Sequence, residues 1–145
     1  MHIFKQALVV LLFLVSFTGI QAQYTLSVDI KGLRKASGCL YFSVFKTEDG
    51  FPDSKEKCFK KGKIMQLKSV TANYTFTDLP AGTYAVSIFH DEDCDTEMKT
   101  NSLGIPLEGT GASNDARGRF GPPKFADAKF TLSADKKITI NMWYF

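Results

Sequence analysis

The sequence has little of what zinc proteins, nucleic-acid-binding proteins and helical membrane proteins need. It holds two histidines and three cysteines, and no cysteine stands at the CxxC or CxxH spacing of a thiolate zinc site. The formal net charge of +3 is too small to indicate a nucleic-acid partner. After the N-terminal segment, no apolar run approaches the roughly 20 residues of a membrane-spanning helix. These absences argue against all three classes.

The N-terminal segment has the composition of a secretory signal. Lys5 precedes an apolar run at residues 7–17, and small residues that suit a signal peptidase follow. We therefore expect residues 1–22 to be a cleaved signal peptide and residues 23–145 to form one domain. This predicts an exported protein, periplasmic or extracellular, with no membrane span after cleavage.

Alternation of apolar and polar residues dominates the remaining chain. Residues 24–30 alternate with a period of two, as in a strand with one buried face. Residues 39–45 are apolar at nearly every position, which is typical of a central strand covered on both faces. Strand patterns recur at residues 64–70, 73–76, 83–90, 128–132 and 136–144. About seven short strands without a convincing helix predict an all-β fold, a single antiparallel β-sandwich.

Turn and loop signals separate these strands. Pro80 and Gly82 predict a tight hairpin with Gly82 at positive φ. Residues 46–63 are polar and predict a long loop with one helical turn. Residues 91–126 are rich in glycine and proline and show no sustained period, which predicts a long loop region. Loops of that length inside a compact domain are more often functional than not.

The cysteines allow one disulfide and one remaining thiol in an oxidising compartment. Cys39 opens an apolar strand, whereas Cys58 and Cys94 lie in polar loops that meet the short distance requirement more easily. The sequence therefore favours a Cys58–Cys94 disulfide, and three free thiols are the alternative.

The acidic loop after residue 90 imitates the opening of a calcium-binding loop, in which alternate carboxylates converge on a hard cation. The match is incomplete, because Thr96 stands where the sharp-turn glycine belongs and Ser102 stands where a bidentate glutamate belongs. A solvated acidic loop paired with Lys99 is the alternative, and the incomplete motif favours it. The candidate metal ligands, with calcium as the ion, are Asp91, Asp93, Asp95 and Glu97.

Catalytic patterns are weak. His90 stands alone at a strand end, and Cys94 is four residues away without a third group to orient the pair. A carboxylate-based hydrolase using Asp91 and Asp93 is the competing enzyme hypothesis. We expect a non-catalytic protein.

A second candidate surface lies in the segment Arg117-Gly-Arg119-Phe120-Gly-Pro-Pro. Arg117, Arg119 and Phe120 are candidate binding-loop residues on a proline-stiffened platform. The alternative, which the composition favours, is a structural loop that packs Phe120 and Phe125 over the sheet.

Four segments resemble a family of exported bacterial proteins, the domain-of-unknown-function 2141 family. They are FTDLPAGTYAVSIFHDED at 76–93, TNSLGIPLEG at 100–109, SNDARGRFGPPKFADAKF at 113–130 and the terminal ITINMWYF. Relatives tend to have HDENGNGKLDTN where this chain has HDEDCDTEMKTN at 90–101. The resemblance implies an envelope or secreted protein, and the family has no assigned reaction.

The unit of two strands joined by the LPAGTY turn is also similar to a unit in transthyretin-like and collagen-binding-protein B-type sandwiches. This likeness implies a transthyretin-like (prealbumin-like) topology. Together the residues and the resemblance predict a monomeric exported β-sandwich that binds a protein or small-molecule ligand in the envelope, or acts there as an accessory module.

Overall fold

The computed structural model describes residue 19 and residues 21–145. The predicted signal peptide lies outside the described residues apart from its last positions. Within these residues, eight strands carry the fold, with a short 3-10 turn η1 (Ser113–Asp115) and a single helical turn α2 (Phe125–Ala128). The strands are β1 (Gln23–Lys31), β2 (Cys39–Phe45), β3 (Lys60–Ile64), β4 (Ala72–Pro80), β5 (Gly82–Asp91), β6 (Gly109–Ala112), β7 (Phe130–Leu132) and β8 (Lys136–Asn141).

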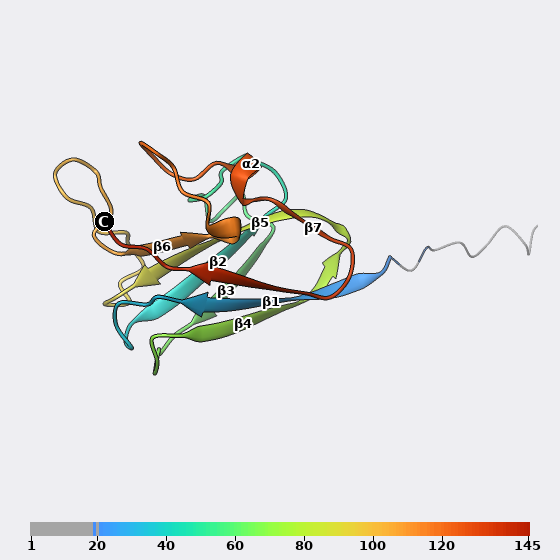
Figure 1. Cartoon of the computed structure of the whole chain (residues 1–145), viewed down its shortest axis with the longest axis horizontal. Coiled ribbons are helices and arrows are strands. Elements are labelled where there is room, and N and C mark those ends of the chain that lie inside the picture. Colours follow the sequence, from blue (N-terminus) through green and yellow to red (C-terminus); the bar gives the residue numbers. More distant parts are fainter. Residues whose placement is uncertain (1–18, 20) are drawn as a thin grey trace, which may run out of the picture.

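Two sheets pack face to face (Figure 1). One has the order β4-β1-β8, and the other has the order β3-β2-β5-β6 with β7 also pairing with β5. The all-β prediction is confirmed, with eight strands instead of about seven. The sheets are not purely antiparallel as expected, because β8 runs parallel to β1. The last strand enters its sheet from the same end as the first.

The core lies between the sheets and follows the period-two pattern. Leu26, Val28 and Ile30 of β1 are fully buried, as are Leu40 and Val44 of β2. Aromatic rings fill the space between the layers. The ring of Phe42 stacks on Tyr74 with centroids 4.8 Å apart and meets the edge of Phe76 at 6.3 Å.

The outer face of β5 is covered by a small second cluster. Its buried members are alanines, and Phe51 and Phe125 pack against them. Ser113 ties this cover to the sheet, because its hydroxyl accepts the N–H of Val86 at 2.9 Å and donates to the carbonyl of Ala128 at 2.6 Å. Coverage on both faces explains why β5 is buried at nearly every position. The alanines are Ala85, Ala112, Ala116 and Ala128.

The turn at residues 80–82 does not form the predicted hairpin. It joins β4 of one sheet to β5 of the other, so the two strands do not pair. Positive φ falls on Asp78 (60°) instead of Gly82. Asp78 lies where the pairing of β1 with β4 shifts register between Tyr24 and Leu26, which is a β-bulge. A bulge of this kind bends its strand locally.

Three further sequence predictions are corrected. The third strand is residues 60–64 and not 64–70. Leu67 is buried in the core, but it lies in the loop after this strand. The expected helical turn around residues 53–59 does not form a helix, and the segment is a series of turns, one of them closed by the Ser54 N–H on the carbonyl of Gly50 at 2.8 Å. The long region at 91–126 is not structureless, since it contains β6, η1 and the start of α2. The strand β6 was missed because Gly-Thr-Gly-Ala carries no large apolar side chain.

Candidate functional site

Asp91, the last residue of β5, anchors the acidic loop from inside. Its side chain is fully buried, and its carboxylate accepts backbone N–H groups from the loop that follows. The N–H of Thr96 donates to Oδ2 at 2.7 Å and the N–H of Asp95 donates to Oδ1 at 3.3 Å. One carboxylate therefore folds the loop back onto the end of its own strand.

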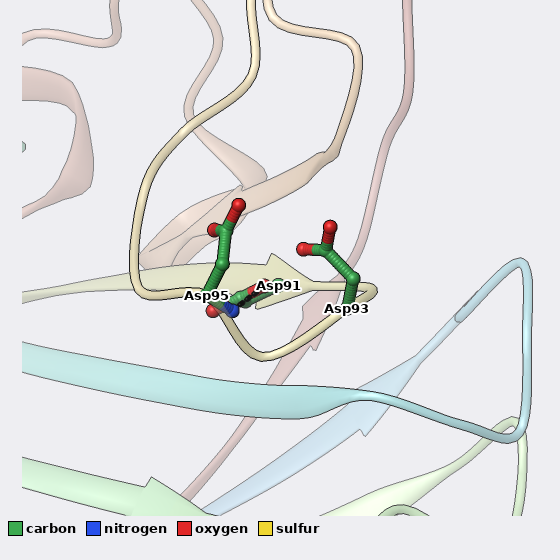
Figure 2. A group of neighbouring side chains, drawn as sticks. All are labelled: Asp91, Asp93 and Asp95. Atoms are coloured by element: carbon green, nitrogen blue, oxygen red, sulfur yellow. Dashed lines mark hydrogen bonds between the residues drawn. The ribbon is translucent and has the colours of Figure 1, made fainter.

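The three aspartates of the predicted metal site converge. Asp91, Asp93 and Asp95 each place a carboxylate oxygen within 4.8 Å of the others. Figure 2 shows the carboxylates of Asp93 and Asp95 on one side of the loop, with Asp91 along the strand below them. Glu97 is not one of the three. It is exposed, and its N–H donates to Oδ1 of Asp95 at 2.9 Å.

Lys99 brings a positive charge to this cluster. Its ammonium forms an ion pair with Asp93 and lies 3.7 Å from Oδ2 of Asp95. All three side chains are about half exposed, and ion pairs at such positions contribute little to stability. The pairing with Lys99 expected for a solvated acidic loop is present, alongside the convergence expected for a metal site.

The disulfide is Cys39–Cys94, so the predicted Cys58–Cys94 pair is wrong. The Cα atoms of Cys39 and Cys94 are 5.4 Å apart. Cys39 opens β2 opposite Asp91 of β5, and the acidic loop turns back over that position. Cys58 is a free thiol in the β2–β3 connection, where it donates to the carbonyl of Lys55. The sequence pattern places Cys39 in the interior, but it does not indicate that the acidic loop passes over this residue.

Two carboxylates close the base of the acidic loop. Glu108 is buried and accepts the N–H of Glu92 at 2.9 Å and the N–H of Lys99 at 3.0 Å, one from each end of the loop. Glu92 forms ion pairs with Arg34 and Lys35, each at 2.6 Å. Burial acts to raise the pKa of Glu92, but the hydrogen bonds from Lys35 and Arg34 outweigh it and lower the pKa below its usual value. Sequence reasoning missed both roles.

His90 is a structural residue. It is fully buried, with Nε2 2.8 Å from the carbonyl of Ser37 and Nδ1 2.7 Å from the hydroxyl of Tyr144. A carbonyl only accepts, so Nε2 carries the hydrogen and the Tyr144 hydroxyl donates to Nδ1. Burial raises the pKa of Tyr144, which keeps that donor protonated. Cys94, the other half of the conceived nucleophile pair, is held in the disulfide.

Residues 98–107 form a narrow protruding turn, here called the apolar turn. Lys99 and Leu107 are joined by a backbone hydrogen bond of 2.8 Å, and the side chain of Asn101 accepts the N–H groups of Leu103 and Ile105. Leu103 at the tip is 81% exposed, and Ile105 and Leu107 are also exposed. From the sequence, this segment stands out only as part of the family resemblance, as TNSLGIPLEG at 100–109.

The Arg117–Phe120 segment also protrudes. Phe120 is 95% exposed and does not pack over the sheet, whereas Phe125 does pack there as expected. The guanidinium of Arg117 lies 5.6 Å from the ring centre of Trp143, and that of Arg119 lies 5.5 Å from the ring centre of Phe120. The alternative of a structural loop that packs over the sheet is therefore wrong for Phe120 and right for Phe125.

A shallow depression of about 540 Å³ lies beside the disulfide. Its lining comes from the β1–β2 and β3–β4 connections and from both cysteines of the disulfide, and it holds no carboxylate and no histidine. Among the residues that the structure describes, no helix is long and apolar enough to cross a membrane.

By its fold, this is a two-sheet β protein whose acidic loop is tied down by a disulfide and which carries two protruding apolar segments. The chain belongs to the DUF2141 family, described as uncharacterized protein conserved in bacteria, whose profile matches residues 28–141. The match confirms the resemblance carried by the FHDED, GIP and FGPPKF segments. Neither a curated protein nor a solved structure matches the chain.

Proposed function

We propose that this chain is an exported, non-catalytic binding or accessory module of the bacterial envelope. Its binding surface is formed by the apolar turn and the Arg117–Phe120 segment. One observation carries the proposal: Leu103 and Phe120 are 81% and 95% exposed on loops whose bases are fixed by hydrogen bonds and packing. Large apolar side chains held out on a rigid β scaffold are typical of a binding surface.

The buried polar groups support a non-catalytic role. Asp91 and Glu108 accept backbone N–H groups, and His90 joins two parts of the framework. A hydrolase would need a carboxylate of raised pKa beside a pocket, and the depression beside the disulfide contains no carboxylate. The hypothesis of a hydrolase using Asp91 and Asp93 is therefore the weaker one.

Expression of the full chain in a Gram-negative host tests export and binding together. We expect mass spectrometry to find a mature N-terminus at Gln23, and cell fractionation to recover the protein with the washed envelope. The double variant Leu103→Ser/Phe120→Ser should move to the soluble periplasmic or culture fraction while keeping its unfolding midpoint. Val70→Ser is the matched control, since Val70 is 50% exposed on a different loop. An uncleaved chain in the cytoplasm contradicts the proposal.

Calcium binding is the second candidate function, favoured by the convergence of Asp91, Asp93 and Asp95 within 4.8 Å. Carboxylate oxygens are the ligands that calcium prefers, and backbone carbonyls of the loop would complete the shell. Lys99 competes for the same oxygens. Glu97 contributes only after a change of rotamer, because it lies outside the converging group.

Thermal unfolding with calcium and with a chelator decides this second candidate. If the loop binds calcium, the midpoint rises with calcium, and rises further in Lys99→Gln because the competing ammonium is gone. Asp93→Asn should remove the shift in both backgrounds. If the unfolding midpoint is the same with calcium and with chelator, both in wild type and in Lys99→Gln, a calcium role is excluded.

The transthyretin-like topology belongs to the same proposal. The two packed sheets and the LPAGTY crossing between them support it. Comparison of an experimental structure with transthyretin-like sandwiches tests it by strand order.

A further inference from the structure

We propose that the two protruding segments dock on the anionic face of a phospholipid membrane. The inference rests on the proposed binding function and names its partner. The docking surface consists of apolar side chains and the cations beside them: Leu103, Ile105, Phe120, Phe145, Arg117 and Arg119.

The apolar members are held away from the protein. Leu103 is 81% exposed, Phe120 is 95% exposed and Phe145 is 64% exposed. Asn101 fixes the turn that carries Leu103 by accepting two backbone N–H groups, so the tip cannot easily fold back to bury that side chain. The interfacial acyl region of a bilayer can accept such side chains, and the gain scales with the apolar area removed from water.

Contacts at the bases bring the two segments to one region of the molecule. Arg117 lies over the ring of Trp143, and Trp143 pairs through its backbone with Thr110 of β6. Thr110 stands two residues after Glu108, which fixes the base of the apolar turn. Phe145 meets the Trp143 ring with centroids 4.4 Å apart. In Figure 1 both segments project on the same side of the molecule, beyond the five-stranded sheet and near the C-terminus.

The charges around Phe120 select an anionic partner. Residues 116–126 contain three cations and no acidic residue; of the two acids that flank them, Asp115 accepts two hydrogen bonds from Asn141 and Asp127 is exposed. In the neighbouring acidic loop, Asp93 and Asp95 are paired with Lys99, and Glu92 is paired with Arg34 and Lys35. Glu97 is exposed there and acts against the attraction. Cations beside an apolar tip match phosphate groups above an acyl layer. The three cations are Arg117, Arg119 and Lys124.

The shape of the surface favours a membrane over a folded protein partner. A stable protein interface needs a continuous complementary area of about 800 Å² on each partner. Here the apolar side chains stand on separate protrusions, and on the apolar turn the polar residues Asn101 and Ser102 directly precede Leu103. A fluid bilayer accepts separate tips at different heights. Trp143, at the base, is a residue type that prefers the headgroup level.

Vesicle binding tests the proposal with the chain from Gln23 onward, which contains every described strand and lacks the apolar leader. Vesicles of phosphatidylglycerol mixed with phosphatidylcholine are compared with vesicles of phosphatidylcholine alone in a sedimentation assay. We expect binding to the mixed vesicles that weakens as salt is added. Trp143 is the only tryptophan in the sequence, so a blue shift of its emission reports docking directly.

Two sets of variants assign the binding to the docking surface. Phe120→Ser and Leu103→Ser should each weaken partitioning by about tenfold or more, since each removes one inserted side chain. Arg117→Gln/Arg119→Gln should weaken binding to the mixed vesicles by about tenfold and leave phosphatidylcholine unaffected. Val70→Ser and Lys61→Gln/Lys63→Gln are matched controls at exposed positions elsewhere, and they should bind as wild type does.

Three results would overturn the inference: no binding to the mixed vesicles, binding that survives in Phe120→Ser and Leu103→Ser, or equal losses in the controls. The proposed function fails separately. Suppose that the chain does not bind vesicles, but is retained by envelope membranes and released when those membranes are treated with protease. Its partner is then a protein. In that case the binding function stands and the membrane docking does not.

Discussion

Cys39 is bonded to Cys94, and Cys39 also faces Asp91 across strands β2 and β5. The first residue of β2 therefore fixes the acidic loop twice, by a ladder pair where the loop leaves β5 and by a covalent bond three residues later. Asp91 then gathers the loop backbone through its carboxylate. The disulfide and the carboxylates of Asp91 and Glu108 together hold the loop in place.

The Cys39–Cys94 disulfide should be the largest single contribution to stability outside the core. The bond closes a loop with a sequence separation of 55, and the chain-entropy relation gives about 4 kcal/mol for that length. Cys39→Ser/Cys94→Ser should lower the free energy of unfolding by about that amount in urea titrations. Cys58→Ser should change it little. Thiol titration of the unfolded, unreduced chain should find one thiol, and three thiols would contradict the pairing.

Thr96 should be strained. Its φ of 70° lies in the left-handed region, which a β-branched residue rarely adopts. Only its backbone is used, by the carboxylate of Asp91 and by the ammonium of Lys55. Thr96→Gly keeps both contacts and should raise the free energy of unfolding by about 1 kcal/mol. Thr100→Gly, without positive φ, should lower it slightly. A destabilised Thr96→Gly would show that the side chain matters.

Gly62 of β3 should not accept a side chain. A Cβ atom there would stand 2.5 Å from Cε1 of Tyr74, whose ring stacks on Phe42 in the core. Gly62→Ala should cost about 1–3 kcal/mol, because a packed ring must move. Gly121→Ala is the control, since nothing lies within 4 Å of its Cβ position. Chemical denaturation measures both variants, and equal stabilities would mean that the Tyr74 ring is free to shift.

Glu92 should make stability depend on acid pH. Its folded-state pKa lies below the unfolded value of 4.5, so its contribution is present at neutral pH. That contribution is lost as the pH falls below 4.5 through the lowered folded pKa. Glu92→Gln should lower the free energy of unfolding by about 1–2 kcal/mol at neutral pH. In acid, the difference in this free energy between the variant and wild type should become smaller. Thermal unfolding from pH 7 to pH 3 checks this. Asp49→Asn, at an exposed ion pair with Lys57, should show little effect.

The convergence of the three aspartates could be proposed from sequence only as a pattern. Alternate acids after a strand can splay into solvent or turn together, and the spacing is the same in both cases. The family resemblance implies glycines in this loop at the positions of Cys94 and Thr96, and both residues have positive φ here. The sequence signal for the turn was therefore present but was hidden by two residues that seldom take that conformation.

The strands that bury one face or both can be predicted from residue order alone, because with period-two alternation, as at Leu26, Val28 and Ile30, a single register buries the apolar side chains. Family membership can be predicted in the same way. Three features depend on the folded chain: the pairing of the cysteines, the passage from one sheet into the other at Pro80, and the exposure of Phe120 beside a packed Phe125. These outcomes depend on contacts between distant segments, and local composition does not encode which segments become neighbours.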